Sequence, residues 1–230
     1  MIYIKRTYCI LAAVLFTVAA ALGLHAFVRA EKPVSARQVS SRYTVVIDAG
    51  HGGRDAGTVG IDGTPEKDIN LAIAKDLYDF LNVCGIHAVL IRDGDYEYYP
   101  PDSDRSRSDL YNRLDFVNSI PSSVLISIHQ NHFEQEKEWG TQIWYSANTA
   151  ESKQLADSIL SQTKLFLQPD NERENKASDD SYYILYRASV PSVMIECGFM
   201  SNRAENERLQ QPSYQQAFAY VILLGICEEV

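Results

Sequence analysis

Two histidines and two glutamates occupy positions from which their side chains can act together. His51, His129 and Glu196 each stand at or directly after the end of a short apolar run, and Glu66 follows a glycine-rich loop. Two imidazoles and one carboxylate that leave a coordination position open are the donors of a catalytic zinc site rather than a structural one. We therefore predict that His51, Glu66 and His129 bind one Zn²⁺ ion per domain, which would make a water in the open position acidic.

Glu196 is expected to have a different task. It is the one carboxylate in the apolar run SVMIECGF, and burying an unpaired charge is costly. A position beside the metal site would offset this cost, and the same surroundings would raise the pKa of Glu196 for proton transfer. The alternative is a structural ion pair, for example with Arg113.

The segments that carry these residues alternate between strand-like and helix-like patterns. Short apolar runs predict strands at Thr44–Ala49, His87–Arg92, Val124–His129, Gln142–Tyr145, Tyr182–Tyr186 and Val193–Ile195. Amphipathic spacing predicts helices at Glu66–Val83 with Thr64 as its cap, around Leu110–Val117, at Glu151–Leu167 and at Ser213–Glu228.

This alternation predicts a single α/β domain, in which a twisted, mostly parallel sheet is flanked by helices on both faces. Ligands bind beyond the carboxyl ends of the strands in such sheets. His51, His129 and Glu196 stand at three of these ends. Their long separation in the sequence carries no signal by itself, so the predicted zinc site depends on this joint placement.

The N-terminal segment has a different composition. Residues 8–28 are apolar and follow Lys5 and Arg6, and about 21 residues in a helix span roughly the 30 Å core of a membrane. Residues 1–30 are therefore predicted to be a signal peptide or a retained membrane anchor, residues 31–42 a polar linker, and residues 43–230 the catalytic domain. Both alternatives place that domain outside the cytoplasmic membrane, either anchored to it or released from it.

Charge and cysteine content exclude other classes of protein. The formal net charge is −9, and because the first 30 residues hold three cations and no acid, residues 31–230 carry −12. No nucleic acid is expected as a partner, since such binders usually have a basic surface. Cys84, Cys197 and Cys227 form no CxxC pair, so neither a disulfide framework nor a cysteine zinc site is expected.

Several motifs in order resemble the N-acetylmuramoyl-L-alanine amidase 3 family, the zinc enzymes of bacterial cell-wall metabolism. These motifs are VVIDAGHGG, EKDINLAIA, L-x-x-R at Leu110–Arg113, ISIHQN, Tyr-x-Leu at Tyr183–Leu185 and PSVMIECGFMSN. The resemblance implies zinc bound by His51, Glu66 and His129, with Glu196 as the catalytic carboxylate. It also implies cleavage of the amide between N-acetylmuramic acid and the L-alanine of a peptidoglycan stem peptide.

The finer role has several candidates. A lone catalytic domain behind an N-terminal apolar segment resembles the spore-cortex amidases, which help to form muramic-δ-lactam. The alternatives are a vegetative autolysin, a zinc peptidase of peptidoglycan, and a wall-binding module without catalysis. Arg113, Asn131 and His132 are candidate substrate-binding residues. His132 stands where many family members have a small residue, and the alternative is that it is a loop residue without a role in binding. Whether a second protein activates the enzyme is left open by the sequence.

Overall fold

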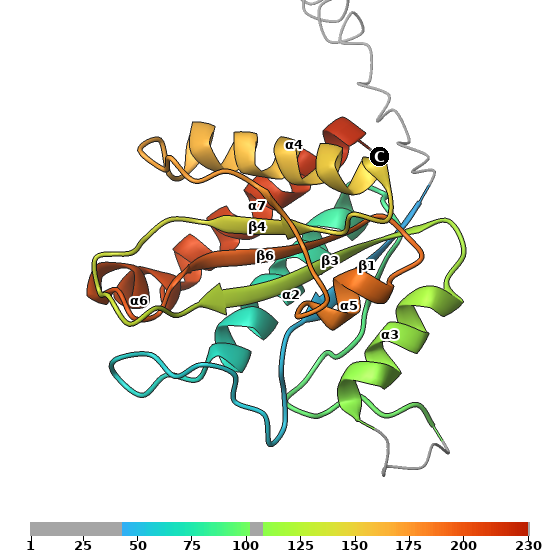
Figure 1. The fold of residues 1–230 in the computed structure, drawn as a ribbon, viewed down its shortest axis with the longest axis horizontal. Coiled ribbons are helices and arrows are strands. Elements are labelled where there is room, and N and C mark those ends of the chain that lie inside the picture. Colours follow the sequence, from blue (N-terminus) through green and yellow to red (C-terminus); the bar gives the residue numbers. More distant parts are fainter. Residues whose placement is uncertain (1–42, 102–107, 230) are drawn as a thin grey trace, which may run out of the picture. The chain divides into compact units, whose positions relative to one another are not determined.

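Six strands form one sheet in the order β2-β1-β3-β6-β4-β5 (Figure 1) in a computed structural model that describes residues 43–101 and 108–229. The strands are β1 (Thr44–Ala49), β2 (Ala88–Leu90), β3 (Ser123–Asn131), β4 (Gln142–Tyr145), β5 (Lys176–Ala177) and β6 (Ser192–Phe199). The helices are α2 (Glu66–Val83), α3 (Asp109–Ser119), α4 (Ala150–Phe166), α5 (Tyr183–Arg187), α6 (Arg203–Leu209) and α7 (Pro212–Glu229).

The four strands from β2 to β6 in this order run parallel to one another, whereas β4 is antiparallel to β6 and parallel to β5. The prediction of a mostly parallel sheet is therefore confirmed. The reversal at β4 follows from its short connection to β3, because a parallel crossover needs a dozen or more residues and usually a helix.

The alternation of side chains along β1 divides the interior into two apolar cores. Val45 and Ile47 pack with residues of α2, α4 and α7, whereas Val46 packs with residues of α3 and α5. All three valine and isoleucine side chains are fully buried. Since successive residues of a strand point to opposite faces, the continuous apolar run requires cover on both faces, and the helices provide it (Figure 1).

The register of the parallel strands brings the predicted site residues to the same end of the sheet. Ala49 of β1 pairs with Ile128 of β3, and His129 pairs with Glu196 of β6. The backbone N–H of Gly50 then donates to the carbonyl of Ile128 at 3.0 Å. The loop after β1 therefore starts beside His129, as the α/β interpretation requires.

Two details of the predicted elements are wrong. Tyr182–Tyr186 was expected to be a strand, but Tyr183–Arg187 is the helix α5, which buries Ile184 and Leu185 against the second core. A short apolar run does not distinguish a strand from one buried helical turn. Thr64 does not cap α2, because its hydroxyl donates to Gln210 and the N-cap position is Pro65.

The first turn of α2 is capped by the backbone of the preceding loop instead. The N–H groups of Glu66 and Lys67 donate to the carbonyls of Thr58 and Ala56 at 2.9 and 3.2 Å. The short elements β5 and α6 were not predicted, and the second strand pairs over Ala88–Leu90 rather than the whole of His87–Arg92.

The predicted segment 8–28 and the predicted linker 31–42 lie outside the described residues. Within residues 43–101 and 108–229, no helix is both long enough and apolar enough to cross a membrane. The division into a leader, a linker and a catalytic domain therefore stays a prediction.

Candidate metal centre and catalytic cleft

His51, Glu66 and His129 lie together at the carboxyl end of the sheet. Each offers one ligand atom, and these atoms lie within 4.8 Å of one another. Nε2 of His51 is 3.3 Å from Oε2 of Glu66, and Nδ1 of His129 is 3.0 Å from Oε1 of the same carboxylate. The two imidazoles meet edge to face, with ring centroids 4.9 Å apart. Two nitrogen donors and one oxygen donor therefore converge from three separate elements.

The Glu66 carboxylate is held by neutral donors as well as by the histidines. Oε1 accepts from the backbone N–H of Gln130 at 2.9 Å and from the side-chain amide of Asn70 at 3.1 Å, and Oε2 accepts from the N–H of Thr58 at 2.9 Å. Burial alone would raise the pKa of Glu66, but hydrogen bonds and charge from the two histidines lower it well below its usual range. Glu66 is therefore an ionised carboxylate of fixed orientation.

Asp55 orients His51 from the other side of its ring. Oδ2 of Asp55 is 2.7 Å from Nδ1 of His51, and Oδ1 accepts from the N–H of Gly57 at 3.0 Å. Burial would lower the pKa of His51, but Glu66 and Asp55 together raise it to about 9. A carboxylate on one ring nitrogen leaves the other free for a cation, which is the arrangement that orients metal-binding histidines.

Glycines make room for this cluster. A Cβ at Gly50 would lie 2.2 Å from Nε2 of His129. A Cβ at Gly57 would lie 2.6 Å from both Oε2 of Glu66 and the His51 ring, and Gly57 has a positive φ of 67°. His51 itself has a φ of 62°, a strained conformation for a residue with a side chain. The loop thus tolerates strain to turn its imidazole inward, as functional sites often do.

Glu196 lies next to the cluster without a partner of its own. It pairs in register with His129, and its Oε2 is fully buried with no hydrogen bond to a described residue. Burial raises the pKa of Glu196 to about 7, although the positive charge of His129 opposes this shift. A carboxyl group with a pKa near neutrality can both accept and return a proton.

Arg113 does not pair with Glu196, so the alternative of a structural ion pair between them is wrong. Nη1 of Arg113 donates to Oδ1 of Asp48 at 2.6 Å and to the carbonyl of Ala49 at 2.8 Å. Nη2 donates to the carbonyl of His51 at 2.6 Å, and Nε donates to Asp109 at 2.8 Å. The buried guanidinium therefore fixes the backbone that leads into His51.

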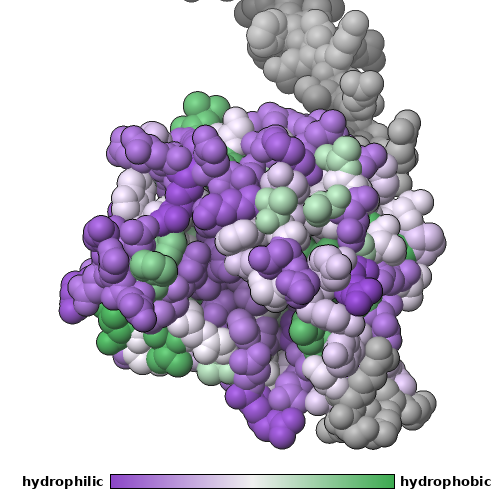
Figure 2. All heavy atoms as spheres, in the orientation of Figure 1, coloured by the Kyte–Doolittle hydropathy of each residue, from purple (hydrophilic) through white to green (hydrophobic). Residues whose placement is uncertain are grey.

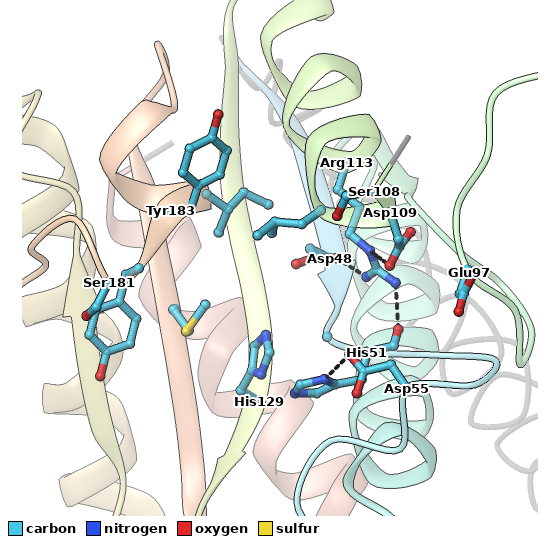
Figure 3. A pocket seen from close by; sticks show the side chains of 15 residues that line it. Asp48, His51, Asp55, Glu97, Ser108, Asp109, Arg113, His129, Ser181 and Tyr183 are labelled. Atoms are coloured by element: carbon cyan, nitrogen blue, oxygen red, sulfur yellow. Dashed lines mark hydrogen bonds and ion pairs between the residues drawn. The ribbon is translucent and has the colours of Figure 1, made fainter. Parts of the chain in front are cut away.

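A cavity of about 380 Å³ opens beside the two histidines. Its lining includes Arg113 and several acidic residues, and also Ser181, Tyr182 and Tyr183. Figure 3 shows His51 and His129 pointing toward each other, with Arg113 and Asp109 on the side of His51 and Tyr183 on the opposite side. The face of the molecule in Figure 2 is largely hydrophilic around a central hollow.

The other two candidate substrate residues lie outside the lining of this cavity. Oδ1 of Asn131 accepts from the backbone N–H of His132 at 2.8 Å, and His132 is exposed. Arg113 lines the cavity, but Nε, Nη1 and Nη2 of its guanidinium all donate to protein acceptors. Contacts of Arg113, Asn131 and His132 with substrate therefore stay predictions.

Sequence reasoning did not identify the groups that support the cluster. Asp55, Asn70 and Asp48 hold His51, Glu66 and Arg113 respectively. The signal for Asp55 was its position four residues after His51 in a glycine-rich loop. For Asn70 it was its place one helical turn after Glu66, which puts both side chains on the same face of α2.

Cys84, Cys197 and Cys227 are all free, which agrees with the absence of a predicted disulfide framework. Only Cys197 is buried, however, whereas Cys84 and Cys227 are exposed.

The fold and the site together define a class of protein. A parallel sheet that gathers two histidines and a glutamate at its strand ends, beside a second glutamate without a partner, has the donor set of a metal-dependent hydrolase. The profile of the N-acetylmuramoyl-L-alanine amidase family matches residues 45–228. The chain belongs to this family and is an amidase that acts on peptidoglycan, as its motifs predicted.

Several relatives agree with this assignment. The chain is 31% identical over 186 residues to the germination-specific N-acetylmuramoyl-L-alanine amidase of Bacillus subtilis, and the match covers 79% of this chain and 77% of the relative. The solved structure of the CwlD amidase from Clostridioides difficile in complex with the GerS lipoprotein has a TM-score of 0.76 and 36% identity, over 81% of this chain and 98% of that one. An amidase from Nostoc punctiforme has a TM-score of 0.71 and 29% identity, over 82% and 97%.

Proposed function

We propose that this amidase uses one Zn²⁺ ion bound by His51, Glu66 and His129, and that Glu196 carries the proton during cleavage. The bond cut is the amide between the lactyl group of N-acetylmuramic acid and the L-alanine of the stem peptide. The observation that supports this assignment is the buried Oε2 of Glu196, which has no partner among the described residues and lies beside the converging donors. The donor set fits zinc, since zinc binds imidazole nitrogen and carboxylate oxygen.

The residues of the chain divide the chemical work between them. When bound, the cation supplies Lewis-acid chemistry, which polarises the amide carbonyl and activates water. Glu196 accepts a proton from the attacking water as its oxygen bonds to the carbonyl carbon. Glu196 then returns that proton to the alanine nitrogen as the carbon–nitrogen bond breaks, which regenerates its carboxylate. Asp55 keeps the His51 ring in place throughout.

The experiment that tests the reaction is the digestion of purified peptidoglycan followed by mass spectrometry of the products. The wild-type protein should release intact stem peptides, and a chelator should abolish this release. Trimmed stem peptides with the first amide intact would instead identify a peptidase, and stable binding without products would identify a wall-binding module.

Glu196→Gln keeps the shape of the side chain but removes its capacity to accept a proton. It should retain one zinc ion per chain, measured by elemental analysis, and should lose activity by about two to four orders of magnitude. A variant with wild-type activity would remove Glu196 from the mechanism. Loss of the metal together with the activity would show that Glu196 helps to bind the ion.

We also propose that the substrate in the cell is the spore cortex, since one relative is named as germination-specific. A strain without this gene should form spores whose cortex lacks muramic-δ-lactam and should germinate poorly. Normal cortex composition together with altered separation of vegetative cells would favour the alternative of a vegetative autolysin.

We propose that residues 1–30 direct residues 43–230 across the cytoplasmic membrane and that residues 31–42 are a linker. The apolar segment 8–28 and the preceding Lys5 and Arg6 support this proposal. Fractionation of cells should find the full chain outside the cytoplasm and a chain without residues 1–30 inside it. The N-terminal sequence of the exported protein distinguishes a cleaved signal from a retained anchor.

We also propose that this amidase binds a partner protein, because one solved relative is in a complex with a lipoprotein. Pull-down of the tagged full chain from sporulating cells, followed by activity measurements with and without the captured protein, tests this proposal. Full activity of the purified chain alone would argue against a required activator.

A further inference from the structure

Tyr182 lines the catalytic cavity but belongs to none of the groups assigned above. It is the residue directly before α5, where its backbone N–H donates to the carbonyl of Asp179 and its carbonyl accepts from Tyr186. Its side chain lines the same cavity as His129 and Met194. Tyr182 therefore belongs to the lining of the cavity between Ser181 and Tyr183, which Figure 3 shows across the cavity from Arg113.

The ring of Tyr182 is held in place by Trp144, which packs against its face. It stacks on Trp144 of β4 with ring centroids 4.5 Å apart and an angle of 29° between the planes. The ammonium of Lys176 lies 5.3 Å from the centroid of Trp144. Trp144 is not among the residues that line the cavity. Stacking of this kind holds a ring in one orientation at little entropic cost, because a tyrosine has few rotatable bonds.

The hydroxyl of Tyr182 makes no hydrogen bond to any residue in the described part of the chain, whereas the phenols of Tyr96, Tyr99 and Tyr214 all have partners there. Burial, together with the negative charges of Glu196 and Asp179, raises the pKa of Tyr182 to about 12. The hydroxyl therefore keeps its proton at physiological pH and can donate a hydrogen bond. A partly buried phenol without a partner in a cavity is a donor available to a ligand.

We propose that Tyr182 is a catalytic residue that donates a hydrogen bond from its hydroxyl to an oxygen of the bound glycopeptide close to the scissile amide. Trp144 is a positioning residue that acts through Tyr182. This inference rests on the proposed function of the site. It adds a substrate contact from Tyr182 that neither the proposed zinc ligands nor Glu196 provides.

Tyr182→Phe removes the hydroxyl and keeps the ring on Trp144. It should lower kcat/KM on a purified muropeptide about tenfold, the loss expected for one hydrogen bond to substrate. Zinc content and Tm should stay at wild-type values. The matched control is Tyr186→Phe, which removes a hydroxyl from an exposed tyrosine four residues away that does not line the cavity. A Tyr182→Phe variant within about twofold of the wild type, like the control, would overturn the proposal.

The role of Trp144 is tested by a double-mutant cycle. Trp144→Leu should lower kcat/KM in the wild-type background and should have little further effect when Tyr182 is already phenylalanine. Independent losses in the two backgrounds would show that Trp144 does not act through the hydroxyl.

A binding measurement separates this inference from the proposed function. In the Glu196→Gln background, calorimetry should show about tenfold weaker binding of the muropeptide after Tyr182→Phe, and equal affinities would overturn the hydrogen bond to the bound glycopeptide. An active Glu196→Gln variant would refute the proposed mechanism, whereas unchanged kcat and KM in Tyr182→Phe would refute only the role of Tyr182.

Discussion

At the scale of single residues, the cluster of His51, Glu66 and His129 depends on neighbouring side chains that hold its members in place. Asp55 is one of these, since it contacts His51 at 2.7 Å on the ring nitrogen opposite Glu66. Asp55→Asn retains a hydrogen-bonding group but removes the negative charge. The preference of His51 for the tautomer with its proton on Nδ1 therefore becomes weaker. We expect zinc affinity to fall about 10–100-fold. Competition with a chromogenic chelator measures this, and an unchanged affinity would show that Asp55 does not orient the ligand.

Gly57 permits the close approach of His51 and Glu66. Gly57→Ala places a Cβ 2.6 Å from groups of both ligands and also imposes strain at a positive φ. Gly63→Ala is the matched control, because Gly63 has a φ of 93° but no atom within 4 Å of the added Cβ. Both variants should lose about 1 kcal/mol or more from backbone strain, but only Gly57→Ala should lose zinc affinity, by about tenfold or more. Equal zinc affinities in the two variants would contradict the steric explanation.

The sequence predicted that His51 and His129 converge because strand ends depend on local patterns. His51 and His129 each follow an apolar run, and the carboxyl ends of parallel strands meet at one end of a sheet. It did not predict how Asp55 reaches His51, since that contact depends on a loop with left-handed backbone at His51 and Gly57. It also left Arg113 as a possible partner of Glu196, because which of several carboxylates pairs with a buried arginine is decided by tertiary packing.

At the scale of elements, Arg113 connects α3 to the end of β1. Asp48 is fully buried and also accepts from the hydroxyl of Ser127. Burial would raise the pKa of Asp48, but attraction to Arg113 and hydrogen bonding lower it below its ordinary value. The stabilisation from ionised Asp48 is therefore complete above the unfolded pKa of about 3.9 and is lost as the pH falls through the lower folded pKa.

Arg113→Met should leave Asp48 buried without a counter-charge and lower the free energy of unfolding at pH 7 by about 3–5 kcal/mol. Urea unfolding in the presence of a chelator measures this without a contribution from the metal. The difference in the free energy of unfolding between Arg113→Met and the wild type should narrow at about pH 3 and below. Asp48 is then protonated in the variant, which removes the unpaired charge, and the wild type progressively loses its ion pair. The control Arg54→Met removes a cation from an exposed pair with Glu97 and should change little. A difference that does not depend on pH would contradict the role of this ion pair.

Helices α4 and α7 approach closely at Gly225. A Cβ there would lie 2.6 Å from Cα of Ile159. Alanine improves the intrinsic helix propensity of α7 by about 1 kcal/mol, but forcing the two helices apart costs about 1–3 kcal/mol. Gly225→Ala should therefore lower Tm, whereas Ser161→Ala at an exposed position of α4 should leave it equal or higher. A raised Tm for Gly225→Ala would show that the helix contact can relax.

Element types were predictable where the periodic pattern was long. The stripe of α2 and the apolar run of β1 appear with boundaries identical to those predicted. The run Tyr182–Tyr186 is too short to show a period, and its helix forms because Ile184 and Leu185 fill the core beneath Trp144 and Met194. The groups that cap the first turn of α2 were not predictable in the same way, because they are the carbonyls of Ala56 and Thr58 in the folded loop rather than the side chain of Thr64.

At the scale of the whole molecule, the alternating pattern predicted the layers of the domain but not the order of its strands. The sheet places β6 between β3 and β4, although β6 is the last strand of the chain. This insertion is what brings Glu196 beside His129. Strand order depends on which crossovers pack best on the sheet, and the pattern of one strand carries no information about it.

The charge of the molecule determines how it meets its substrate. Residues 31–230 carry −12, so this part of the chain is repelled by walls that bear anionic polymers. Salt screens such repulsion, with a Debye length that shortens to about 8 Å at 0.15 M. Hydrolysis of intact walls by residues 31–230 should therefore speed up as NaCl rises from about 20 to about 150 mM. The rate on a short neutral muropeptide should stay nearly constant, which controls for effects of salt on the active site. If the rate on intact walls instead falls as salt rises, the contact is attractive. Cationic residues of this otherwise acidic part of the chain would then bind the wall.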